Sequence, residues 1–219
     1  MTNITANNFS CPKCSAVTEL KLQVPLVICC PSCQETYFIN KEHKATNAYL
    51  LKHDLSPLKV IELNASGEYK KIRFTIIGHI RSINTHSITN EWLMKFDNNT
   101  YGWLIENGFK YYIFENDPIS ISANSIIGKN VGDSVKIKEI DYTIYDLSKQ
   151  IKFRMDGQIP ENDFNDGELF IYEAIANDFV SLTTIVIYDK TTVEAFKGIE
   201  IKLTDLKIST LANFKKWLS

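Results

Sequence analysis

The sequence predicts an all-β protein, in which a small cysteine-bearing module precedes an antiparallel β-sheet body and a short helix ends the chain. All five cysteines lie between positions 11 and 33. Beyond Val60, β-branched and aromatic residues come in short runs separated by Gly, Asn and Asp, which is the pattern of strands joined by turns. Near the end, Leu211, Phe214 and Leu218 follow a helical spacing after the capping residue Ser209.

Composition and charge narrow the class of protein. The 219 residues are 44% hydrophobic and 23% charged, which is typical of a folded globular chain. No apolar run approaches the roughly 18 residues of a membrane helix, and the polar start lacks the features of a secretion signal, so a cytoplasmic location is predicted. A net charge of −2 and a pI near 6.1 disfavour binding to nucleic acid that is mainly electrostatic.

The cysteines form two C-x-x-C pairs, Cys11 with Cys14 and Cys30 with Cys33. Fifteen residues separate the pairs, which is the spacing of a four-cysteine zinc ribbon. We therefore expect one Zn²⁺ bound by all four thiolates. Because four thiolates leave the ion no open position for water, the site is predicted to be structural and not catalytic.

Cys29 is the spare cysteine of the cluster. Its simplest role is that of a small buried hydrophobe, and the alternative is a redox-active thiol. Disulfides are a second alternative for the cluster, which the odd cysteine count and the missing secretion signal disfavour. Between the pairs, residues 19–24 alternate like a strand, and residues 35–39 are expected to pair with them.

The chain divides into four predicted segments. They are a zinc ribbon (1–44), a connector (45–59), an all-β body (60–208) and a helical tail (209–219). The body is expected to be either a sandwich or a barrel-like sheet, and two related halves, 60–118 and 125–208, are a further option. Predicted strands span 71–83, 91–96, 101–105, 109–114, 134–145, 151–155, 168–175, 179–188 and 195–203.

An aromatic-rich stretch runs from Trp92 to Phe114 and reads as a three-strand meander. It could stack nucleic-acid bases, or it could be a sheet core with cross-strand aromatic pairs. The core interpretation is favoured because only Lys95 and Lys110 in this stretch are basic.

An acidic stretch from Asp156 to Asp178 contains no Lys or Arg. Its candidate binding residues are Asp156, Glu161, Asp163, Asp166 and Glu168. Clustered carboxylates attract hard cations and polyamines, but the spacing of a calcium loop is absent. A solvated acidic loop is therefore the favoured interpretation.

The order of motifs resembles the prokaryotic domain-of-unknown-function family number 4178, with an N-terminal four-cysteine zinc ribbon. The resemblance rests on Phe74 to Arg81, Glu91-Trp92, Trp103-Leu104, Tyr111 to Phe114 and Met155 to Pro160, and it covers roughly residues 60–208. Gln158 and Ile159 differ from the acidic residue and leucine of the family's pattern. The family has no established reaction. The resemblance implies a bacterial accessory protein linked to a membrane-associated, polyamine or stress system.

No catalytic motif stands out, since the four histidines are scattered and the sequence lacks G-x-S-x-G, P-loop and H-E-x-x-H patterns. The prediction is therefore a non-catalytic zinc-binding interaction or adaptor module. Its expected partners are proteins, including a membrane protein complex, and a small-molecule substrate is disfavoured. The alternative is a nucleic-acid-associated zinc-ribbon protein that uses Lys13, Lys21, Lys41 and Lys44 to bind phosphates.

Overall fold

The computed structural model describes most of the chain. The described residues are 4–5, 7–48, 60–83, 88–107, 110–115, 117–160, 168–179, 181–188 and 191–209, and for 150–153 and Glu168 only the backbone is described. The predicted helix lies outside them apart from Ser209, and so does most of the predicted connector. Antiparallel strands dominate the described chain, which confirms the all-β prediction. Its described helices are the short 3₁₀ turns η1 (Ala123–Ser125) and η3 (Leu203–Leu206).

The N-terminal module contains six short strands. They are β1 (Ile4–Thr5), β2 (Asn8–Ser10), β3 (Val17–Glu19), β4 (Leu26–Cys29), β5 (Thr36–Ile39) and β6 (Ala45–Asn47). Strands β1 to β3 form a separate small sheet. The strand expected at 19–24 is wrong beyond Glu19, where β3 ends. Its expected pairing with residues 35–39 is also wrong, because β5 pairs with β4 and β6. The apolar run Leu26–Cys29 is fully buried, so it takes the central position in this part of the sheet.

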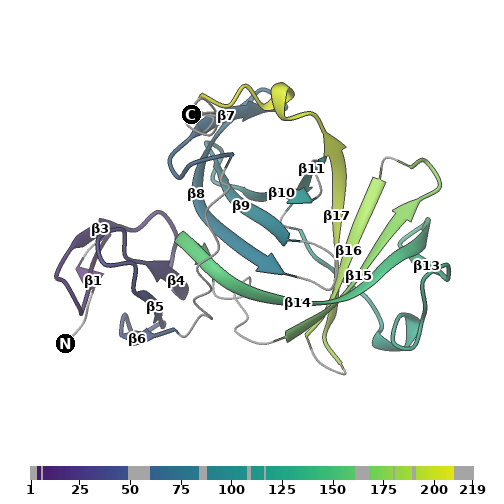
Figure 1. Ribbon diagram of the computed structural model, residues 1–219, viewed down its shortest axis with the longest axis horizontal. Helices are drawn as coiled ribbons and strands as arrows, with labels where there is room; N and C mark the ends of the chain where they lie inside the picture. The colour runs from purple at the N-terminus through teal and green to yellow at the C-terminus, as the bar shows by residue number, and fades with distance from the viewer. Residues whose placement is uncertain are drawn as a thin grey trace, which may run out of the picture.

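The body contains the remaining strands. They are β7 (Ser66–Tyr69), β8 (Ile72–Ile83), β9 (Ile88–Phe96), β10 (Tyr101–Asn107), β11 (Lys110–Glu115), β12 (Ile119–Ser120), β13 (Ser134–Ile137), β14 (Ile140–Pro160), β15 (Glu168–Ala176), β16 (Ser181–Ile187) and β17 (Val193–Ile201). The sheet runs β14-β15-β16-β17-β11-β10-β9-β8-β7, and β8 also pairs with β14, so the path of pairings returns to its start (Figure 1). Strands of both predicted halves therefore belong to one sheet.

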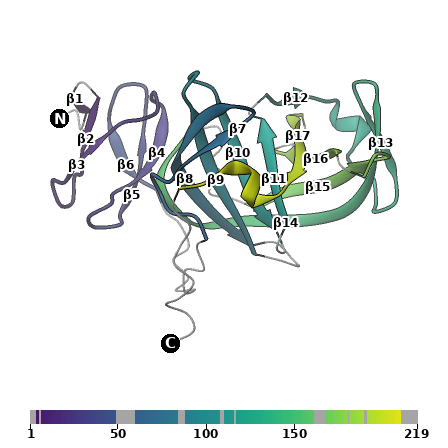
Figure 2. The ribbon, with the colours of Figure 1, turned by 90° about the horizontal axis from the view of Figure 1, so that it is seen from above.

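Strand β14 connects the two parts of the body to each other and to the N-terminal module. It pairs with β13 and β15 along its first part, with β8 at residues 151–157, and with β4 at its end. The last of these pairings joins the N-terminal module to the body in one 14-stranded sheet. Figure 2 shows the module at one end of the molecule, beside β8.

The hydrophobic core is continuous across this junction. Phe9 and Leu26 of the module belong to the same cluster of buried residues as Leu93, Trp103 and Met155 of the body. A second cluster lies around Trp92 and includes Phe74 and Leu206, so η3 covers this face of the sheet. The module is therefore packed against the body as well as hydrogen-bonded to it.

The aromatic stretch is part of this core. β10 pairs with β9 and β11, which confirms the predicted meander. Trp92, Trp103 and Phe114 are all buried, and the Trp92 indole donates a hydrogen bond to the carbonyl of Ile61 at 3.2 Å. These rings are not available to stack on bases.

Candidate metal centre

Each C-x-x-C pair lies in the loop of a hairpin. Cys11 and Cys14 lie between β2 and β3, whereas Cys30 and Cys33 lie between β4 and β5. Both loops fold in the same way, because the residue after the second cysteine donates its backbone N–H to the carbonyl of the first cysteine at 2.9 Å. The same residue has a positive φ in both loops. This repeated turn directs both thiols of each pair to one side.

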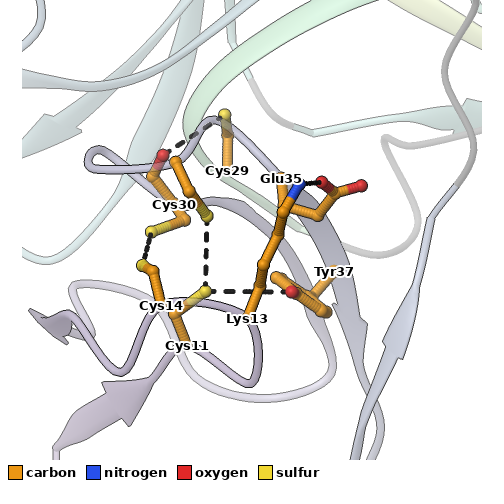
Figure 3. A network of polar contacts seen from close by, with 8 residues as sticks. Cys11, Lys13, Cys14, Cys29, Cys30, Glu35 and Tyr37 are labelled. Atoms are coloured by element: carbon orange, nitrogen blue, oxygen red, sulfur yellow. Dashed lines mark hydrogen bonds and ion pairs between the residues drawn. The ribbon is translucent and has the colours of Figure 1, made fainter.

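The four sulfurs converge on one point (Figure 3). The Sγ atoms of Cys11 and Cys33 are 3.6 Å apart, and those of Cys14 and Cys30 are also 3.6 Å apart. All four Sγ atoms lie within 4.8 Å of one another. A tetrahedral site with metal–sulfur bonds of about 2.3 Å has sulfur–sulfur edges of about 3.8 Å. The sulfur cluster therefore has the size of a tetrahedral metal site.

Cys29 does not belong to the cluster. Its thiol is buried and contacts the carbonyl of Cys30 at 4.0 Å. The shortest of the given sulfur–sulfur distances, 3.6 Å, far exceeds the roughly 2.05 Å of a disulfide bond, so no disulfide joins these cysteines. The structure thus brings together the four cysteines that the spacing predicts.

Two contacts that the spacing did not predict support the cluster. The Tyr37 hydroxyl is 3.8 Å from the Cys11 sulfur, and the Tyr37 side chain is buried. Once Cys11 is a thiolate, that hydroxyl is placed to donate a hydrogen bond to it. The Lys13 ammonium is 2.6 Å from a Glu35 carboxylate oxygen, so an ion pair links the two loops.

The thiols of the cluster differ in acidity. Burial by itself raises the pKa of Cys11, but hydrogen bonds from the backbone amides of Cys14 and Lys13 and from Tyr37 lower it to about 6. For Cys33, a backbone hydrogen bond from Glu35 lowers the pKa, but burial and the three neighbouring sulfurs raise it to about 12. Four thiolates this close repel one another, so a cation bound between them would stabilise the ionised set.

Gln158, at the end of β14, ties the module to the body. Its amide oxygen accepts hydrogen bonds from the backbone N–H groups of Lys21 and Leu22 at 2.7 and 3.3 Å, and its amide nitrogen donates to the carbonyl of Glu19 at 2.7 Å. The Lys95 ammonium donates to the carbonyl of Lys21 at 2.9 Å. These contacts join residues far apart in the sequence, so spacing rules could not identify them.

The structure describes only part of the predicted acidic stretch. Glu161, Asp163 and Asp166 lie outside the described residues, and Glu168 is described only by its backbone. Asp156 is described, and one of its carboxylate oxygens is 3.5 Å from Nδ1 of His79 and 3.8 Å from Nε of Arg154. Whether the stretch binds a cation stays a prediction.

His79 belongs to a polar network that the sequence did not indicate. Its ring is buried, lies 3.1 Å from Oδ1 of Asn90, and stacks on Trp92 with ring centroids 5.5 Å apart. The Asn90 amide donates to Glu106 at 2.9 Å, and Glu106 accepts a hydrogen bond from Tyr111 at 3.1 Å. The network links four neighbouring strands, and we assign it a structural role.

Comparison with known proteins identified no match among family models, curated proteins or solved structures. The resemblance given above therefore stays a prediction. Among the described residues, no helix is long and apolar enough to span a membrane.

Proposed function

We propose that the chain is a non-catalytic binding protein whose N-terminal module is folded by one structural zinc ion. The observation that carries this proposal is the convergence of four cysteine sulfurs at the distances of a tetrahedral site. An all-sulfur tetrahedral set favours zinc or an iron–sulfur centre, and the two-pair spacing is typical of zinc ribbons. Such a site has no position for substrate, so the metal's contribution is to folding.

The expected ligand of the whole protein is another protein. Strands β4 to β6 of the module share one sheet with the body, and the module and the body share one core, so the metal holds loops of the module in place beside the body. A partner can therefore contact both parts at once. The resemblance adds a membrane-associated complex as the class of partner to test first.

Nucleic acid is the second candidate, and the contacts of the lysines count against it. Lys13 is paired with Glu35, and the Lys21 ammonium donates to Asn64 at 2.6 Å. Two of the four lysines predicted to bind phosphates thus already have partners in the protein. Lys41 and Lys44 are exposed, but two charges give only weak attraction at physiological salt.

Elemental analysis of protein purified without chelator tests the metal. We expect one zinc per chain in the wild type and in Cys29→Ser, and its loss in Cys30→Ser. A metal-free wild type would contradict the proposal. Equal loss of zinc from both variants would contradict the assignment of Cys29 as the spare cysteine.

Affinity capture from native lysate, compared between wild type and Cys30→Ser and repeated after nuclease treatment, tests the partner class. We expect capture of a protein that survives nuclease and depends on the metal. Capture that nuclease abolishes, together with salt-dependent binding to DNA or RNA oligonucleotides, would favour the nucleic-acid alternative instead.

A further inference from the structure

A hollow of about 310 Å³ lies at one end of the strands of the body, far along the sequence from the cysteines. The β7–β8 turn, the β9–β10 turn and the end of β11 surround it. Its lining includes four aromatic rings, those of Tyr69, Phe96, Tyr101 and Phe114. Ile72 and Ile113 complete the apolar part of the wall.

Gly102 keeps the wall of the hollow close to the backbone. A Cβ atom at this position would lie 3.1 Å from the carbonyl oxygen of Phe114 and 3.2 Å from the Phe96 ring. The Tyr101 side chain beside it is half-buried and lines the hollow. The hollow thus presents the partly exposed rings of Tyr69 and Tyr101, with no side chain at position 102 between them, whereas Phe96 and Phe114 are buried behind it.

The mouth of the hollow carries more negative than positive charge. Lys70 is the cation among the lining residues, whereas Glu115 and Asp117 are anions. The Lys70 ammonium is 2.9 Å from Glu115 and 5.1 Å from the centroid of the Tyr69 ring. Both side chains of this ion pair are more than half exposed, so the pair itself contributes little to stability.

The position of Lys70 is unusual for its residue type. Lys70 and Lys71 form the β7–β8 turn with φ values of 49° and 67°, a conformation that lysine rarely adopts. The turn directs an ammonium group to the place where a carboxylate and an aromatic ring meet. These are the two groups that recognise alkylated ammonium ligands in proteins.

We propose that this hollow binds an organic ammonium cation, whose place the Lys70 ammonium takes in the free protein. The carboxylates of Glu115 and Asp117 attract the charge, and the partly exposed rings of Tyr69 and Tyr101 contact the alkyl groups around it. Displaced Lys70 moves into solvent, because its side chain is long and its turn lies at the surface. The site is independent of the metal centre, so either proposal can fail alone.

The test is a titration of the full-length chain, followed by amide shifts in ¹H–¹⁵N NMR spectra. The probes are choline and its neutral isostere 3,3-dimethylbutan-1-ol, which has the same shape without the charge. We expect choline to bind with millimolar affinity and to shift the amides of Tyr69, Gly102 and Glu115. The neutral isostere is expected to leave them in place.

Two variants and two controls complete the design. Lys70→Met removes the competing ammonium and should tighten choline binding about three- to tenfold, whereas Glu115→Gln should weaken it by a similar factor. Lys110 and Glu200 form a comparable exposed pair at 3.0 Å outside the hollow, so Lys110→Met and Glu200→Gln should have no effect. Absence of choline-induced shifts in both wild type and Lys70→Met, or equal binding of the neutral isostere, would overturn the proposal.

Discussion

Replacing Gln158 by Leu should loosen the contact between the N-terminal module and the body. The Gln158 side chain is buried and makes three hydrogen bonds to backbone groups of residues 19, 21 and 22. Leu fills a similar volume but offers no polar atoms, so the backbone groups lose their partners. Because each lost hydrogen bond costs about 1 kcal/mol and unsatisfied buried groups cost more, we expect a loss of about 2 to 4 kcal/mol.

Differential scanning calorimetry of the metal-loaded protein measures this loss. For a chain of this length it corresponds to a decrease of roughly 5 to 15 °C in the melting temperature. Gln23→Leu is the matched control, because Gln23 is exposed and lies in the loop between β3 and β4 that Gln158 contacts. A Gln158→Leu protein that melts within about 2 °C of the wild type and releases metal to a chelator at the same rate would refute the reasoning.

Three further predictions concern single side chains. Tyr37→Phe should keep the metal but release it about tenfold faster to a chelator, since the Cys11 sulfur loses its hydroxyl contact; an unchanged rate would contradict this. Burial raises the pKa of the Glu173 carboxyl above its value in the unfolded chain. The contribution of this carboxyl to folding stability is therefore fully present below the unfolded pKa and is lost as the pH rises through the folded pKa. Glu173→Gln should therefore raise the melting temperature at pH 7 to 8 and have little effect near pH 4, whereas the exposed control Glu139→Gln should show no such trend. Trp92→Ala should cost about 3 to 5 kcal/mol in denaturant unfolding, because the ring is fully buried, and a loss below about 1 kcal/mol would place it outside the core.

The strands of the body were largely predictable because β-branched and aromatic residues alternate along them. The strand predicted at 71–83 is β8, and the strand predicted at 91–96 lies within β9. The separate strand predicted at 151–155 is wrong, because these residues lie inside β14, which runs without a break from Ile140 to Pro160. Other failures occur where turns lack glycine or asparagine. Residues 134–145 were predicted as one strand, but the chain turns between β13 and β14, and Lys138 in that turn has a φ of 53°. Lysines at positive φ give no turn signal in a sequence.

Only the cysteines of the candidate metal centre were predictable from the sequence, and the residues that support them were not. C-x-x-C pairs bring their own thiols together through a local turn, so the four cysteines of the cluster could be identified from spacing. Tyr37 and Gln158 could not, because each acts across a contact that only the folded chain creates. The hollow beside Lys70 was not predicted for the same reason, since its walls come from three separate turns and strand ends.

The end of β14 explains why an amide is suited to position 158. Pairing between β14 and β8 reaches Gly157 opposite Gly78, and the next three residues pair with β4 of the module. A glutamate at 158 could accept the two N–H groups but could not donate to the carbonyl of Glu19. Glutamine at this position therefore fits a body strand whose end is bound by the N-terminal module. Because β4 leads directly into Cys30, loss of the metal is expected to loosen β4 and expose the edge of β14 to other strands.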